Sequence, residues 1–223
     1  MIEVAAGTIV VFSDIGCPWA HLAVHRLHAQ RTALGLEDAV RLDHRCFPLE
    51  LFNARPTPKP ILDAEVPVVG GLDPAAGWST WTGGPAAYPV TMLPALEAVQ
   101  AAKRQGLRAS EELDIALRQA FFRDCRCISL RTEILDVAAA CPSVDVATLM
   151  ADLDSGRCRA DVIAQWHTAE TAEVKGSPHV FLADGSNAHN PGVRLHWEGP
   201  KPGGFPVVDL NDPGVVDDLL RRA

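Results

Sequence analysis

A cysteine near the start of the 223-residue chain stands where a predicted strand gives way to a predicted helix. Residues 8–12 form an apolar run typical of a buried strand, and helical periodicity begins at Pro18, directly after Cys17. Proline suits the first helical position because the N–H that it lacks would have no helical partner there. The positive end of the helix dipole favours a thiolate over a thiol, so Cys17 is predicted to be an acidic nucleophile.

The flanking segments predict a βαβ unit. The helical pattern that starts at Pro18 ends near Gly35, and residues 40–47 alternate like a second strand. A strand, a helix and a strand at this spacing imply two parallel strands joined by a right-handed crossover.

Residues 48–89 differ in composition, with eight prolines and two Gly-Gly pairs around Trp78 and Trp81. We predict a long irregular loop, held in order by its tryptophans.

The remainder of the chain predicts helices first and strands later. Start and stop signals place five helices, over residues 91–105, 110–122, 129–141, 145–156 and 157–174. Lys175 to Pro178 then forms a turn into a strand that ends at Leu182, and Asp184-Gly185 indicates a hairpin. We expect the returning strand over 193–197, a loop over 199–206 and a closing helix over 213–220. The early βαβ unit would combine with the late strands and the closing helix to make one sheet flanked by helices.

This order of elements, with Cys17-Pro18 at the first strand–helix junction and Gly-Ser-Pro before the third strand, resembles the thioredoxin superfamily. It is most similar to the branch in which a helical domain interrupts the fold: DsbA-like and FrnE-like oxidoreductases, 2-hydroxychromene-2-carboxylate isomerases and kappa-class glutathione transferases. The resemblance implies an α/β thioredoxin-like domain over residues 1–55 and 172–223, with a loop and helical insertion over 56–171.

The resemblance also implies the site residues. Cys17 would be the catalytic nucleophile, facing a cis-proline at Pro178. The motif and substrate contacts would be Pro18, Trp19, Ala20, His21, Ser177 and Pro178, with the Trp19 side chain exposed. The family's usual motif has a second cysteine where Ala20 stands, so a single cysteine would form a mixed disulfide that an external thiol releases.

Two alternatives remain open at this stage. In the first, Cys17 takes the role that serine has in the transferase and isomerase branch, and activates the sulfur of a bound small thiol. In the second, the redox site has decayed and the cleft binds a peptide or a partner protein.

Three histidines follow Cys17 along one helical stripe. His21 could tune the thiolate, or Cys17, His21 and His25 could bind a metal ion. We favour a solvated helix edge that continues through His28, and predict no metal site. Cys125 and Cys127 could be a remote resolving pair, but ordinary core or surface thiols are the favoured interpretation.

Charge and cysteine content limit the classes of partner and the cellular location that we expect. The net charge of −8 disfavours a nucleic-acid surface and gives no reason to expect membranes. The start of the sequence lacks the pattern of a signal peptide and six cysteines form no C-x-x-C pair, which favours a cytoplasmic protein with free thiols. No tightly bound cofactor is expected. The partners would be glutathione or another low-molecular-weight thiol and a disulfide-bearing peptide or protein, and the chain could form a homodimer.

Overall fold

A computed structural model describes residues 2–171 and 173–223 of the chain, and its central sheet confirms the predicted βαβ unit. Strand β1 (Thr8–Ser13) is buried along its whole length and pairs in parallel with β2 (Arg41–Cys46). Helix α1 (Pro18–Ala33) connects them, with Pro18 in its first turn as expected. Two short antiparallel strands, β3 (His179–Phe181) and β4 (Asn187–His189), complete a sheet of order β2-β1-β3-β4.

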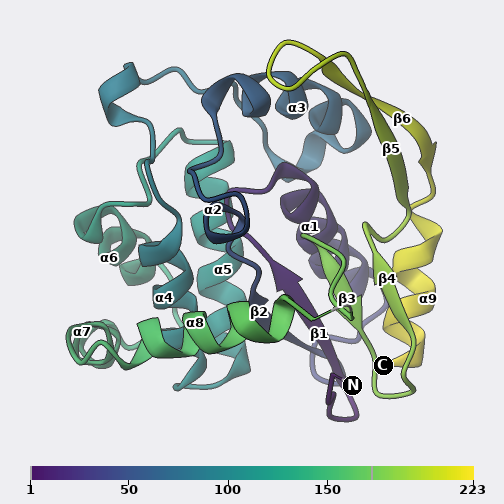
Figure 1. Cartoon of the computed structure of the whole chain (residues 1–223). Coiled ribbons are helices and arrows are strands. Elements are labelled where there is room, and N and C mark those ends of the chain that lie inside the picture. The colour runs from purple at the N-terminus through teal and green to yellow at the C-terminus, as the bar shows by residue number, and fades with distance from the viewer. Residues whose placement is uncertain (1, 172) are drawn as a thin grey trace.

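The helical segments cover the β2 edge of this sheet (Figure 1). Their bounds are α4 Leu93–Lys103, α5 Leu107–Phe122, α6 Arg131–Ala139, α7 Val146–Asp154 and α8 Arg157–Ala169. Asp145 caps α7 through a 2.6 Å hydrogen bond from the Thr148 N–H, as its sequence position predicts. The helices share an apolar core of their own, which includes Leu113 and Phe122. The predicted domain boundary at residue 172 lies outside the described residues.

The prediction of an irregular loop over residues 48–89 is wrong. This stretch contains α2 (Leu49–Phe52) and the fourteen-residue helix α3 (Lys59–Leu72), followed by two short 3-10 turns, Pro74–Ala76 and Pro85–Ala87. Pro60 lies in the first turn of α3, where a missing N–H costs nothing, and Pro67 is tolerated inside the helix. Burial of Leu62, Val66 and Val69 on one face stabilises a helix that its prolines disfavour.

The predicted pairing of the late strands is also wrong. Strand β5 (Val193–Glu198) does not return to β3 but pairs with β6 (Phe205–Asn211), in a separate two-stranded sheet. A tight turn, closed by the Leu182 N–H on the carbonyl of Ser186, instead brings back β4, which was expected to be loop. Residues 199–206, which were expected to be a loop, contain the turn of the β5–β6 hairpin and the first residues of β6.

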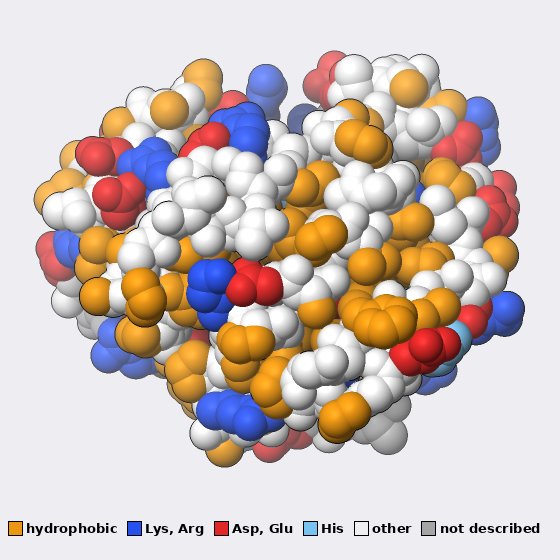
Figure 2. Space-filling model, turned by 90° about the horizontal axis from the view of Figure 1, so that it is seen from above, with side chains coloured by type: hydrophobic (Ala, Val, Ile, Leu, Met, Phe, Trp, Pro, Cys, Tyr) orange, Lys and Arg blue, Asp and Glu red, His pale blue; other side chains and the backbone are white. Residues whose placement is uncertain are grey.

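The β5–β6 hairpin packs beside α3 at one end of the molecule (Figure 1). Val193, Leu195 and Val208 face the cluster that holds Cys17. Seen from this end, hydrophobic side chains gather over the middle and the right half of the surface (Figure 2). The hairpin therefore forms one wall beside the Cys17 region.

Helix α9 (Gly214–Arg222) closes the chain where the sequence predicted it, and packs with α1 over one face of the sheet. Its core contacts are Val216, Leu219 and Leu220. In the described part of the chain, no helix has the length and apolar character needed to span a bilayer.

Candidate active site

Cys17 lies at the N-terminus of α1, on the wall of a cleft of about 330 Å³. Its side chain is buried, with 5% of the residue exposed. The thiol donates a hydrogen bond to the carbonyl oxygen of Ser177, over 3.2 Å between Sγ and O. The peptide bond between Ser177 and Pro178 is cis. The fold thus brings together Cys17 and the Gly-Ser-Pro turn, which lie at opposite ends of the sequence.

Asp14 holds the three segments around the cleft in place. Its carboxylate accepts hydrogen bonds from the N–H groups of Gly16 (2.7 Å) and Leu49 (2.8 Å), and its own N–H donates to Ser177 Oγ (2.9 Å). The Arg118 guanidinium donates to the Asp14 carbonyl at 2.9 Å. One buried residue therefore joins the Cys17 turn, the start of α2 and the turn before β3. The sequence analysis missed Asp14, although its place two residues before Gly16 is a recognisable Asx-type signal.

The expectation of an acidic Cys17 is wrong for this structure. Burial raises the pKa of the thiol to about 12, and the carboxylate of Glu65 adds to the increase. A contact with the Ser177 side chain lowers this pKa but is outweighed. Removing a thiolate from water costs more here than the helix dipole returns, and the carboxylates of Glu65 and Asp14 add to that cost. With this pKa, Cys17 is a thiol at neutral pH.

Glu65 reaches the cleft from α3, the helix that the sequence analysis missed. Its Oε1 accepts a hydrogen bond from Trp19 Nε1 at 3.1 Å, and burial raises the pKa of its carboxyl. The same contact corrects the expectation of an exposed Trp19, since only 7% of this residue is exposed. Trp19 therefore forms part of the wall of the cleft and fixes the Glu65 carboxylate beside Cys17.

Two cations line the rim of the cleft, and neither was predicted. Arg55 lies between α2 and α3, and Lys201 lies in the turn between β5 and β6. The Lys201 ammonium is 4.2 Å from the centre of the Trp197 ring. No sequence signal distinguishes these cations from the other surface cations, because only the folding of the hairpin brings Lys201 to Cys17.

Comparisons with known proteins show which solved structures share the fold of this chain. No protein-family model and no curated protein matches the chain. Among solved structures it is similar to the cytosolic disulfide reductase DsbM from Pseudomonas aeruginosa with GSH, at 13% identity over 96% of both chains and a TM-score of 0.65. A probable DsbA oxidoreductase from Streptomyces coelicolor matches at 21% identity over 81% of this chain and 82% of its own, with a TM-score of 0.64. A 2-hydroxychromene-2-carboxylate isomerase matches at 14% identity over 81% and 87%, with a TM-score of 0.57.

The chain has the DsbA-like form of the thioredoxin fold. The predicted fold class, a thioredoxin-like α/β unit interrupted by helices, is therefore confirmed. In this DsbA-like fold Ala20 is completely buried on α1, one turn after Cys17, and supplies no sulfur.

The interpretation of His21 as part of a solvated edge is wrong. The ring is fully buried, stacked on Phe122 at 4.9 Å and edge-on to Trp78 at 4.6 Å, with Nε2 3.1 Å from the Ala76 carbonyl. Burial lowers the pKa of His21 to about 3, so the ring is neutral and cannot tune Cys17 as an imidazolium. In the described residues, no group of three or more His, Cys, Asp or Glu side chains is arranged to hold a metal ion.

The remaining cysteines lie away from the cleft lining. All six cysteines are free. Cys125 and Cys127 are half-buried after α5, and the Cys125 thiol is 3.7 Å from the Thr80 carbonyl oxygen. Cys46 is fully buried in the helical core cluster. None of these residues lines the Cys17 cleft.

Proposed function

We propose that this protein is a thiol-disulfide oxidoreductase that acts through the single cysteine Cys17. The observation that carries the proposal is the contact between the Cys17 thiol and the Ser177 carbonyl on the wall of an open cleft. The catalytic residue would be Cys17, and the substrate contacts would come from Pro18, Trp19, Ser177 and Pro178. Ala20 and His21 would serve only to pack α1, because both are fully buried.

The proposed reaction has two exchange steps. Cys17 loses its proton as its sulfur attacks one sulfur of a substrate disulfide, which forms a mixed disulfide and releases the other sulfur as a thiolate. That leaving thiolate takes the proton that Cys17 loses. A low-molecular-weight thiol then attacks the substrate-derived sulfur of the mixed disulfide, which releases Cys17 and joins the small thiol to that sulfur. If that sulfur already belongs to the small thiol, the product is the oxidised small thiol. Otherwise a second cycle at Cys17 reduces the new mixed disulfide to the same product. The net reaction is reduction of the substrate by two equivalents of thiol, or by one if the substrate already carries the small thiol.

The cleft favours a small thiol that carries carboxylates, such as glutathione. Its volume of about 330 Å³ lies at the lower end of the range of small-molecule sites. Arg55 and Lys201 would bind carboxylate groups at the rim, and Glu65 would accept hydrogen bonds from an ammonium group. The similar structure of DsbM with GSH supports this choice. The six free cysteines support a reducing, cytoplasmic location.

Intact-protein mass spectrometry tests the proposal. Incubation with oxidised glutathione should add one glutathione to the chain, and peptide mapping should place it on Cys17. The adduct should disappear on addition of reduced glutathione. Absence of an adduct at Cys17, while Cys125 or Cys127 is modified, would refute the proposal.

The protonated state of Cys17 favours a second candidate function. A thiol with a pKa of about 12 is a donor at neutral pH, and could donate its hydrogen to the sulfur of a bound small thiolate, as a serine hydroxyl would. The protein would then activate the bound thiol for attack on an electrophile. Cys17→Ser distinguishes the two functions, because it would preserve this activity and abolish disulfide exchange.

A further inference from the structure

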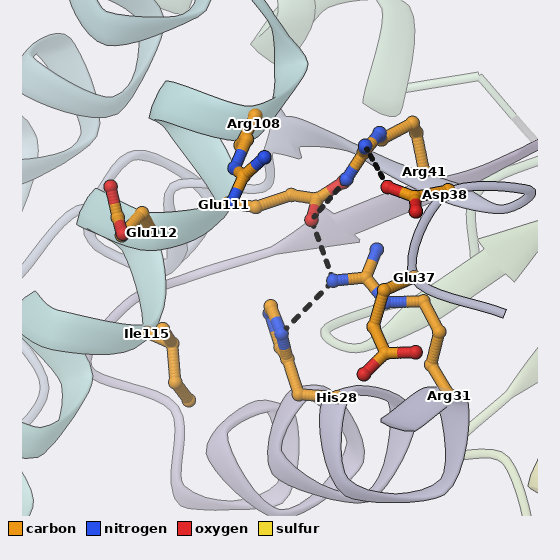
Figure 3. Close-up of a pocket in the computed structure, with 9 residues that line it drawn as sticks. All are labelled: His28, Arg31, Glu37, Asp38, Arg41, Arg108, Glu111, Glu112 and Ile115. Atoms are coloured by element: carbon orange, nitrogen blue, oxygen red, sulfur yellow. Dashed lines mark hydrogen bonds and ion pairs between the residues drawn. The ribbon is translucent and has the colours of Figure 1, made fainter. Parts of the chain in front are cut away.

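A second cavity, of about 230 Å³, lies between α1, the start of β2 and α5 (Figure 3). It shares no lining residue with the Cys17 cleft. Charged side chains dominate its lining, and they come from both the sheet side and the helical side of the molecule.

Arg31, on the wall of this cavity, has an unused donor. The residue is only 5% exposed, and its guanidinium donates to Glu111 Oε2 at 2.6 Å and to the Val40 carbonyl at 3.0 Å. Its Nε–H group is buried without a hydrogen-bond partner in the described structure. A buried donor on a charged group is costly when it is left unpaired, so this wall favours an added acceptor.

His28 supplies a second unused donor on the same wall. Its Nδ1 lies 3.3 Å from Nη2 of Arg31. A guanidinium can only donate, so Nδ1 must accept and the ring proton must be on Nε2. Burial lowers the pKa of His28 to about 3, which keeps the ring in this neutral form. The Nε2–H group is buried and has no partner among the described residues.

The carboxylates around the cavity are mostly occupied by donors of the fold. Glu111 Oε1 accepts the Leu42 N–H at 2.7 Å, and Glu112 Oε2 accepts the Ser143 N–H at 2.7 Å. Asp38 is paired with Arg41 at 3.7 Å.

Arg108 and Glu37 are the charged groups that stay outside this network. Arg108, exposed on α5, has no carboxylate within ion-pair distance in the described residues. The Glu37 carboxylate is drawn between the side chains of His28 and Arg31, on the other side of the Arg31 guanidinium from Arg108 (Figure 3). The buried polar atoms of the lining that have no partner in the described structure are therefore both donors, Arg31 Nε and His28 Nε2, and the exposed Arg108 adds a cation without an ion-pair partner.

We infer that this cavity binds a small oxyanion, such as a phosphate or a carboxylate group of a small metabolite, between Arg31 and Arg108. The volume excludes a large ligand, since it is below the usual range of about 300–1,000 Å³ for small-molecule sites. The bound anion would join α1 and β2 to α5, and so would stabilise the docking of the helical segments on the sheet. This inference does not depend on the reaction at Cys17.

Isothermal titration with inorganic phosphate, at an ionic strength held constant with chloride, tests the inference on the full chain. The wild type should bind one phosphate, and its Tm should rise by about 3 °C at a phosphate concentration ten times Kd. Arg108→Gln should weaken phosphate binding at least about tenfold without unfolding the protein, because Arg108 is exposed.

Two matched variants make the result decisive. Arg221→Gln removes another exposed arginine, on α9, and should bind phosphate like the wild type. Glu37→Gln should leave phosphate binding unchanged or tighten it. The inference is overturned if the wild type shows no saturable phosphate binding, if Arg108→Gln binds as well as the wild type, or if Glu37→Gln weakens binding.

Discussion

The thiol of Cys17 donates a hydrogen bond to the carbonyl oxygen of Ser177, a residue 160 positions further along the chain. This contact joins the first turn of α1 to the turn that enters β3, and Asp14 supports both sides of it. Because the thiol is the donor, ionisation of Cys17 removes the hydrogen bond at the same time as it creates a buried negative charge. The reactivity of the site therefore depends on the groups that surround this sulfur.

Cys17→Ala should abolish disulfide reduction, to below about a thousandth of the wild-type rate, because no other described cysteine lines the cleft. The double variant Cys125→Ser/Cys127→Ser should retain the wild-type rate, since both thiols lie outside the cleft. A coupled assay of oxidised glutathione formation measures both. Loss of turnover in the double variant would show that a remote cysteine resolves the mixed disulfide.

Glu65→Gln should lower the pKa of Cys17. The ionised carboxylate raises this pKa, and the glutamine oxygen can still accept the hydrogen bond from Trp19. The rate of iodoacetamide alkylation at pH 8 should rise severalfold. Asp63→Asn removes a partly exposed acid from the same helix and is the control, with no expected change. Equal alkylation rates in the wild type and Glu65→Gln would exclude a charge effect of Glu65 on the thiol.

Arg118→Ala should destabilise the protein by about 3–5 kcal/mol. Arg118 is fully buried, pairs with Asp114 at 2.6 Å and donates to Ser13 Oγ and the Asp14 carbonyl. Its removal leaves a buried carboxylate without its cation. Urea denaturation measures the change in the free energy of unfolding. Arg123→Ala, which breaks an exposed pair with Asp124, should change it by less than about 1 kcal/mol. Similar losses in the two variants would contradict this account.

Asp14→Asn should remove a pH dependence of stability. Burial raises the pKa of Asp14 from 3.8 to about 6, so the native state binds the proton more tightly than the unfolded chain does. The resulting contribution to stability is complete below about pH 3.8 and is lost as the pH rises through 6, a change of about 3 kcal/mol.

Urea denaturation of the wild type and Asp14→Asn between pH 4 and pH 7 measures this contribution to the free energy of unfolding. The variant also loses the hydrogen bond from Leu49, so it is expected to be less stable throughout. The difference in the free energy of unfolding between the two proteins should narrow as the pH rises. Asp218→Asn, at an exposed position of α9, should follow the wild-type profile. A gap that stays constant with pH would show that Asp14 is not the titrating group.

Several elements could be predicted because their signals are local. The apolar run of β1, the proline at the first turn of α1 and the Asp145 cap each depend on neighbouring residues only. Helix α3 was missed because its prolines are unfavourable on local grounds, and the burial of one face outweighs them. The prediction of a solvated helix edge at His21 failed for a similar reason. Histidine is a polar residue type, but the His21 ring packs between Trp78 and Phe122.

Local sequence was enough to predict the βαβ unit and the position of Cys17 at a helix N-terminus, and it shows alanine where a second cysteine would stand at position 20. The protonation state of Cys17 depends instead on packing between distant segments. Glu65 reaches it from a distant segment, and burial together with this carboxylate outweighs the helix dipole, which is the one influence that local sequence reveals. Electrostatic effects depend on distance in space and on exclusion of water, and both are set by packing between parts of the chain that are far apart in sequence.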